Sequence, residues 1–71
     1  MYYGEVNEDE EPNGYGFLYK EKKIYEFPWI HASPLGTGWM VDSKTILNGF
    51  ALNGMSGFVL WESSSWIIEY L

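Results

Sequence analysis

The sequence predicts a small all-β protein, an antiparallel meander of about seven short strands built from repeated hairpins. Three observations support this fold class. Aromatic residues make up 20% of the 71 residues, and aromatic side chains favour strands. Glycine-containing turns lead into apolar runs of strand length, a pattern typical of hairpins. A stretch of sequence also recurs at an offset of 22 residues, which indicates a repeated structural unit.

The repeat aligns residues 12–25 with residues 34–47, and five of the fourteen positions are identical. A looser third copy begins at Asn53–Gly54 and has one extra residue between its glycines. We treat residues 1–71 as a single domain, with approximate hairpin units 2–27, 28–47 and 48–71. The predicted strands are 2–6, 15–19, 24–30, 37–41, 45–52, 57–61 and 65–71, and the turns between hairpin arms are 20–23, 42–44 and 62–64.

The alternation along each strand predicts how the side chains divide between the two faces of the sheet. Gly16 and Gly38 are expected to receive aromatic rings from the neighbouring hairpin, because a glycine in a strand permits close approach. One face is then expected to carry Phe17, Trp39 and Phe58, and the other Leu18, Met40 and Val59. The sequence does not say which of the two faces is buried.

A helix over about residues 43–53 is the alternative for one segment, and it would make the fold α+β. Asp42 precedes apolar residues at Ile46, Leu47 and Phe50, which fits a capped amphipathic helix. Gly49 in the middle of this segment weakens the helix, and the 22-residue repeat favours strands.

Charge is unevenly distributed along the chain. The formal net charge is -6, from ten acidic and four basic residues, and seven of the acids lie in residues 1–27. This balance argues against direct binding to nucleic acid, which requires basic side chains to neutralise phosphates, and against an anionic membrane surface. Residues 28–71 carry few charges among many large apolar side chains, so we expect a second copy of the chain or a partner to cover part of them.

Catalytic and metal-binding patterns are weak. The sequence has no cysteine and one histidine, His31, which excludes thiolate catalysis and cysteine-based zinc sites. His31 is interpreted as a turn residue between Ile30 and Pro34. Glu8–Glu11 lack the spacing of a calcium loop and are interpreted as a solvated acidic loop. We therefore predict no enzyme activity, no cofactor and no metal site.

A cytoplasmic location is expected from the same survey. Residues 1–6 have neither the basic region nor the apolar run of a secretory signal. No apolar stretch approaches the roughly 18 residues of a transmembrane helix.

Residues 2–27 resemble a MORN repeat. The resemblance rests on Tyr2-Tyr3-Gly4-Glu5, Asn13-Gly14-Tyr15-Gly16 and Ile24-Tyr25-Glu26-Phe27. It implies hairpin units stacked into an elongated β-meander that acts as a scaffold for protein contacts. The chain departs from the pattern at Phe27, where the family has glycine. In size and charge the chain also resembles small acidic phage proteins that inhibit host nucleases.

These observations favour a non-catalytic protein-binding module or small acidic inhibitor that covers a partner's surface. An aromatic sheet face would supply affinity, an acidic loop would steer a basic or nucleic-acid-binding protein partner, and the chain itself is expected to form a homo-oligomer. The expected partner-binding residues are Trp39, Phe58, Trp61, Trp66, Glu8, Asp9, Glu10 and Glu11. The alternative is an oligomer that binds a nucleotide or carbohydrate by aromatic stacking, with Trp29, Trp39 and Tyr15 as its ligand-binding residues.

Overall fold

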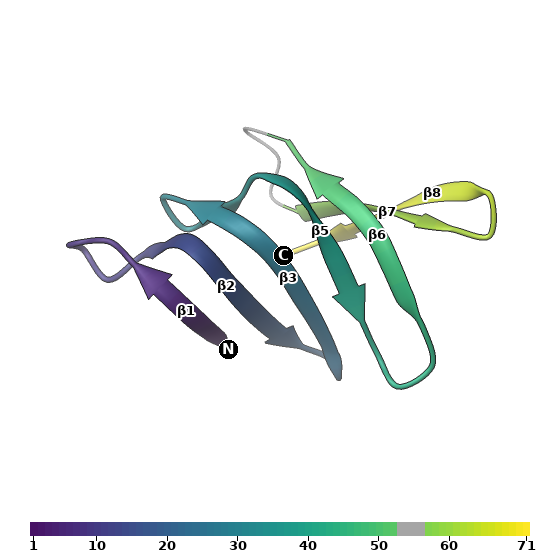
Figure 1. Ribbon diagram of the computed structural model, residues 1–71, viewed down its shortest axis with the longest axis horizontal. Helices are drawn as coiled ribbons and strands as arrows, with labels where there is room; N and C mark the ends of the chain where they lie inside the picture. Colours follow the sequence, from purple (N-terminus) through teal and green to yellow (C-terminus); the bar gives the residue numbers. More distant parts are fainter. Residues whose placement is uncertain (53–56) are drawn as a thin grey trace.

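The computed structural model describes residues 1–52 and 57–71, and in them it confirms the all-β antiparallel meander (Figure 1). The predicted strands are present, with one addition, a two-residue strand at Ser33–Pro34. The strands are β1 (Tyr2–Val6), β2 (Pro12–Lys20), β3 (Lys23–Ile30), β4 (Ser33–Pro34), β5 (Gly36–Val41), β6 (Ile46–Ala51), β7 (Gly57–Glu62) and β8 (Ser65–Tyr70).

The strands pair in one sheet in the order β1-β2-β3-β5-β6-β7-β8, with β4 paired to β3 alone. The sheet coils, so that the β7–β8 hairpin lies across the other strands and the C-terminus lies over the middle of the sheet (Figure 1). Two contacts join β8 to the opposite end of the strand order. Lys20 Nζ donates to the carbonyl of Tyr70 at 2.8 Å, and Lys23 Nζ lies 3.2 Å from a carboxylate oxygen of Glu69. The sheet thus folds over its own inner face.

Three hairpin connections are two-residue turns in which both residues have positive φ: Glu21–Lys22, His31–Ala32 and Ser63–Ser64. This backbone conformation matches the right-handed twist of the flanking strands. The turns are therefore compatible with a strongly twisted meander, although none of them contains the glycine that this conformation favours.

The helix alternative is wrong for residues 43–52, where the chain forms a turn and β6; Asn53 lies outside the described residues. Asp42 Oδ1 accepts hydrogen bonds from the backbone N–H groups of Lys44 and Thr45, both at 2.8 Å. The same local side-chain bonding serves helix caps and turns. Pairing of the following residues with β5 decides between them, because it places Leu47 and Gly49 on the buried face of a strand.

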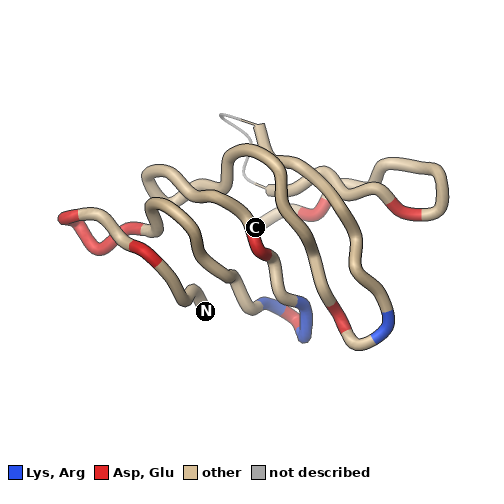
Figure 2. Tube along the Cα trace, viewed as in Figure 1, with Lys and Arg blue, Asp and Glu red and all other residues tan. Residues whose placement is uncertain are grey.

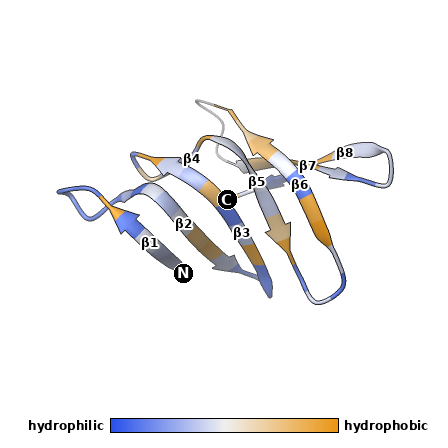
Figure 3. Ribbon diagram, viewed as in Figure 1, coloured by the Kyte–Doolittle hydropathy of each residue, from blue (hydrophilic) through white to orange (hydrophobic). Residues whose placement is uncertain are grey.

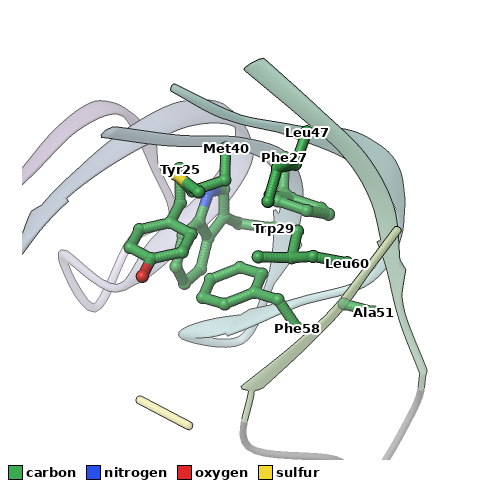
Figure 4. Packing of buried hydrophobic residues seen from close by; sticks show 8 residues of the cluster. All are labelled: Tyr25, Phe27, Trp29, Met40, Leu47, Ala51, Phe58 and Leu60. Carbon is green, nitrogen blue, oxygen red and sulfur yellow. The ribbon is translucent and has the colours of Figure 1, made fainter. Parts of the chain in front are cut away.

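The hydrophobic core lies on the inner face, between the body of the sheet and the β7–β8 hairpin that crosses it. Figure 3 shows hydrophobic residues on several strands and hydrophilic ones in the acidic loop and in the turn between β5 and β6. On β3 every second side chain, from Tyr25 through Phe27 to Trp29, is buried. Figure 4 shows that Phe58 lies among the aromatic side chains of β3, with ring centroids 4.6 Å from Phe27 and 6.3 Å from Trp29. The core residues are Tyr25, Phe27, Trp29, Met40, Leu47, Ala51, Phe58 and Leu60.

Both repeat glycines receive an aromatic ring, as predicted, but only the ring over Gly38 comes from the neighbouring hairpin; the ring over Gly16 comes from the opening strand. The ring of Tyr2, from β1, covers Gly16, and the ring of Phe27, from β3, covers Gly38. A methyl group at either position would overlap the covering ring. On the inner face, aromatic rings therefore pack against the backbone at equivalent places in the two well-matched copies of the repeat.

The predicted division of side chains between faces holds for the first two copies and is wrong for the third. Phe17 and Trp39 lie on the outer face, but Phe58 is 1% exposed and belongs to the core. The register with β6 places Leu60 opposite Gly49 on the inner face, and Phe58 shares that face by alternation. A one-residue difference in phase reverses every side chain of a strand. The first residues of the third copy, Asn53–Gly54, lie outside the described part of the chain.

Candidate binding surface

The face of the sheet opposite the core, here called the outer face, exposes large apolar side chains along most of the sheet. Trp39 is 46% exposed and Trp66 is 54% exposed, which is unusual for residues of this size in a domain that also buries eight apolar residues. The exposed apolar residues of the outer face include Tyr3, Tyr15, Phe17, Tyr19, Ile24, Trp39, Ile46, Trp61, Trp66 and Ile68.

A straight row of five side chains crosses the outer face from β1 to β6. Strand pairing sets Tyr3 opposite Phe17, Phe17 opposite Glu26, Glu26 opposite Trp39, and Trp39 opposite Asn48. Directly paired residues on one face have their Cβ atoms about 5 Å apart. The row therefore holds a carboxylate between two aromatic side chains.

A groove of about 350 Å³ lies beside this row, and we call it the Glu26 groove. It is lined by Tyr15, Glu26, Pro28, Thr37, Trp39 and Asn48, among others. Its volume falls within the range of small-ligand sites, about 300 to 1,000 Å³. The walls combine aromatic rings with a carboxylate, a hydroxyl and an amide.

The groove exists because β3 and β5 stop pairing halfway along their length. Their ladder runs from Ile24–Val41 to Glu26–Trp39 and goes no further. Pro28 follows, and proline has no N–H to donate to a neighbouring strand. Its carbonyl accepts a hydrogen bond from Leu35 N at 2.9 Å instead, and β4 pairs with the end of β3. β3 and β5 thus form no ladder pairs where the groove lies.

Two other parts of the outer face are wholly apolar. A hollow of about 370 Å³ near the N-terminus is lined by Tyr3, Phe17, Tyr19 and Ile24. Toward the C-terminus the indole of Trp66 contacts Phe50 and Trp61 edge-on, with ring centroids 5.3 and 4.8 Å away. The Glu26 groove lies between these two apolar areas, on the strands that join them.

The acidic loop, residues 7–11, is held in a defined shape by Asn7. Asn7 Oδ1 accepts from the backbone N–H groups of Asp9 and Glu11, at 2.9 and 3.0 Å, and its Nδ2 donates to the Glu11 carboxylate at 3.1 Å. An Asn side chain that bonds to the backbone two residues later is a common way to stabilise a turn. The exposed carboxylates of Glu8 to Glu10 are therefore carried on an ordered loop.

The lysines lie away from the acidic loop, although other acidic residues lie beside them and elsewhere in the sheet (Figure 2). The acidic loop forms one end of the long axis, and the lysines lie in the β2–β3 and β5–β6 turns. Lys23 bonds to Glu69, and this hydrogen bond with its charge attraction raises the pKa of the Lys23 ammonium above its ordinary value. Lys20 bonds to β8 as well. Both cations are thus engaged by β8.

The structure divides the predicted partner-binding residues among four places. Trp39 lies in the middle of the outer face, and Trp61 and Trp66 pair with each other in the β7–β8 hairpin. The acidic loop and the tip of that hairpin lie at opposite ends of a molecule 39 Å long (Figure 1). Phe58 is in the core and exposes no surface to a partner.

The residues of the alternative ligand site divide too. Tyr15 and Trp39 line the same groove, whereas Trp29 is 5% exposed and its indole N–H donates to the carbonyl of Gly16 at 3.3 Å. Trp29 therefore belongs to the core. The residue that the sequence prediction missed is Glu26. The sequence did contain a signal for it, because Glu26 is the one charged residue in the otherwise apolar and aromatic run of residues 24–30.

The structure places His31 in the turn between β3 and β4, with its backbone N–H bonded to Asn13 Oδ1 at 3.2 Å. Asp42, an acid that a histidine-based catalytic site could use, lies beyond the other end of the β3–β5 ladder. It is therefore separated from His31 by the length of β3. Among residues 1–52 and 57–71, no three His, Cys, Asp or Glu side chains gather in a way that would hold a metal ion.

No helix long and apolar enough to cross a membrane occurs in the described part of the chain.

Comparison of the chain with protein-family models, curated proteins and solved structures found no match. The resemblances to MORN repeats and to small acidic phage inhibitors therefore stay predictions.

Proposed function

We propose that the protein is a non-catalytic binding module that covers a surface of a basic protein partner with its outer face. The observation that carries this proposal is the contrast between the two faces of one sheet. The inner face buries a complete core, yet the outer face exposes Trp39, Trp61 and Trp66. Monomeric proteins rarely expose large contiguous apolar areas, and tryptophan and tyrosine dominate the energetics of protein interfaces.

The dimensions of the molecule suit a single partner. Its two longer extents are 39 and 24 Å, and a standard protein interface buries about 800 Å² on each side. A partner that covers most of the outer face would thus reach from the Trp61–Trp66 pair toward the acidic loop. The distance between the Trp61–Trp66 pair and the acidic loop is therefore compatible with one interface of ordinary size.

Electrostatics favour a basic partner. The net charge is -6, and the ordered acidic loop projects several carboxylates at one end of the sheet. Such a field accelerates the encounter with a positively charged surface and disfavours an acidic one. By covering a basic surface of its partner, the protein would prevent that surface from binding other molecules and so inhibit the partner.

The test is affinity capture with the tagged protein, followed by titration of the captured protein in purified form. The variant Trp39→Ser/Trp66→Ser alters the outer face. His31→Asn is the control, because His31 lies in a turn at the end of β3 with positive φ, which asparagine tolerates. We expect one basic protein to form a stoichiometric complex with wild type and with the control, and to lose binding to the double variant. Binding should also slow as salt is raised, because exposed charges are screened.

Equal binding of the basic protein by the double variant would refute the role of the outer face. If no basic protein is captured, the protein sediments as an oligomer, and Trp39 and Trp66 are shielded in it, the outer face would instead be assigned to self-association.

A second candidate function is small-ligand binding by stacking, because Tyr15 and Trp39 share one groove. The Glu26 carboxylate in that groove repels phosphate groups, so a neutral carbohydrate is favoured over a nucleotide. Titration with neutral oligosaccharides and with nucleoside phosphates, followed by Trp fluorescence, separates this function from protein binding. Loss of saccharide binding in Trp39→Leu, measured by calorimetry because the variant lacks the reporting indole, would support it.

A further inference from the structure

We propose that the Glu26 groove is a subsite for one arginine side chain of the partner. The guanidinium would bind the Glu26 carboxylate and lie against the rings of Tyr15 and Trp39. This inference rests on the proposed function, since it assumes a basic protein partner, and it names the chemistry by which that partner is recognised.

The charge of the groove is the first argument. Glu26 is exposed within the groove, and the ion pair found among the described residues joins Lys23 to Glu69 on the other face. No lysine of the described chain therefore neutralises Glu26. A carboxylate set between aromatic side chains, with room beside it, is complementary to a cation.

A second carboxylate, that of Glu5, does not line the groove but bonds to the backbone of a residue that does. Glu5 Oε1 accepts a hydrogen bond from the backbone N–H of Tyr15 at 2.7 Å, and Tyr15 lines the groove. The acidic loop precedes β2, the strand that carries Tyr15. The strand that carries Tyr15 thus begins beside the acidic loop, and the negative potential of that loop would attract an approaching cation.

The walls favour arginine over lysine. A guanidinium is planar, stacks on aromatic faces and is less strongly hydrated than an ammonium group. Tyr15 and Trp39 supply the aromatic surface. Thr37 and Asn48 complete the lining, but the Asn48 side-chain amide donates to the carbonyl of Gly38 at 3.3 Å, so its oxygen is the part left to accept from a guanidinium.

The test uses three peptides, acetyl-Gly-Arg-Gly-amide and its citrulline and lysine counterparts, titrated into the ¹⁵N-labelled protein. Citrulline keeps the shape of arginine and removes the charge. We expect the arginine peptide to shift the Gly38 amide and the Trp39 indole signals, and to bind at least about fivefold more tightly than the citrulline peptide. The lysine peptide should lie between them.

Two variants locate the effect. Glu26→Gln should weaken binding of the arginine peptide by about five- to tenfold, and Trp39→Leu by a similar factor. Glu62→Gln is the matched control, because Glu62 is an exposed carboxylate at the end of β7, and it should leave binding within about twofold.

Equal binding of the arginine and citrulline peptides, or no shift at Gly38 and Trp39 at the highest soluble concentration, would overturn the arginine subsite. So would a neutral saccharide that shifts the same signals while the arginine peptide does not. These results leave the proposed function standing if a basic partner still requires Trp39 and Trp66. Conversely, specific arginine-peptide binding without any basic partner would refute the proposed function alone.

Discussion

The ring of Phe58 stacks on the ring of Tyr25, with centroids 4.5 Å apart and an angle of 11° between their planes. The two residues lie in β7 and β3, which are not neighbours in the sheet. This contact therefore holds the β7–β8 hairpin across the inner face and buries one side of the sheet. The outer face is left without a covering layer.

Phe58→Ala should lower the free energy of unfolding by about 3 to 5 kcal/mol, since it removes a large side chain from a filled core. Urea unfolding followed by tryptophan fluorescence measures the loss. Phe17→Ala, at a ring that is 46% exposed on the outer face, is the control and should cost about 0.5 kcal/mol. If Phe58→Ala does not fold, Phe58→Leu should fold with a smaller loss. Similar costs at positions 17 and 58 would contradict the burial of one face.

Gly38→Ala should destabilise the fold by about 1 to 3 kcal/mol. The new methyl group would meet the carbonyl oxygen of Glu26 and come within 2.7 Å of the Phe27 ring. Thr37→Ala, one residue away and pointing to the outer face, is the control and should be close to neutral. Thermal unfolding of both variants gives the comparison. A neutral Gly38→Ala would show that the Phe27 ring does not lie over this glycine.

Replacing Ser63–Ser64 with Asn–Gly should raise the free energy of unfolding by about 0.5 to 1 kcal/mol. Both serines have positive φ, 49° and 67°, and Asn-Gly is the pair that this turn favours. The gain comes from removing backbone strain without changing any packed side chain. Ser64→Ala should move stability the other way, because alanine is disfavoured at positive φ. Chemical denaturation measures the free energy of unfolding of both variants. Changes of the same sign in the two would exclude this turn conformation.

The Asp42 carboxyl should titrate below its ordinary range. Hydrogen bonds from the backbone N–H groups of Lys44 and Thr45 lower its pKa, because they favour the charged form. The contribution to stability is present above the unfolded-state pKa and is lost as the pH falls through the folded-state pKa. NMR should show the amide signals of Lys44 and Thr45 moving together with the carboxyl.

Asp42→Asn is the control for this titration. It keeps an oxygen acceptor, so the turn should persist without the pH-dependent shifts, whereas Asp42→Ala should loosen the turn at every pH. A carboxyl that titrates at its ordinary pKa would contradict the two hydrogen bonds.

The hairpins could be predicted because their signals are local. Apolar runs of strand length, such as that of β3, and turn residues between the arms depend on neighbours in the chain. The acidic loop was found for the same reason. Asp42 shows where local signals stop, since its side-chain bonding suits a helix cap and a turn alike. Pairing of β6 with β5 was needed to choose between them.

The candidate site was only partly predictable. Trp39 and Tyr15 were named, but Trp29 and Phe58 were assigned to binding although they form the core. Aromatic residues serve a core and an interface equally well in sequence, so composition does not distinguish them. Glu26 was missed because its importance depends on residues from β2 and β5 that flank it.

The sequence by itself determined the class of fold, the positions of the hairpins and the acidic character of one end of the molecule. Those properties follow from side-chain alternation, turn chemistry and charge, which act over a few residues. The tertiary structure alone decided which face is buried and where the groove opens. Both depend on contacts between distant strands, the stacking of Phe58 on Tyr25 and the end of the β3–β5 ladder at Glu26. A shift of one residue in register would have exchanged the core with the binding surface.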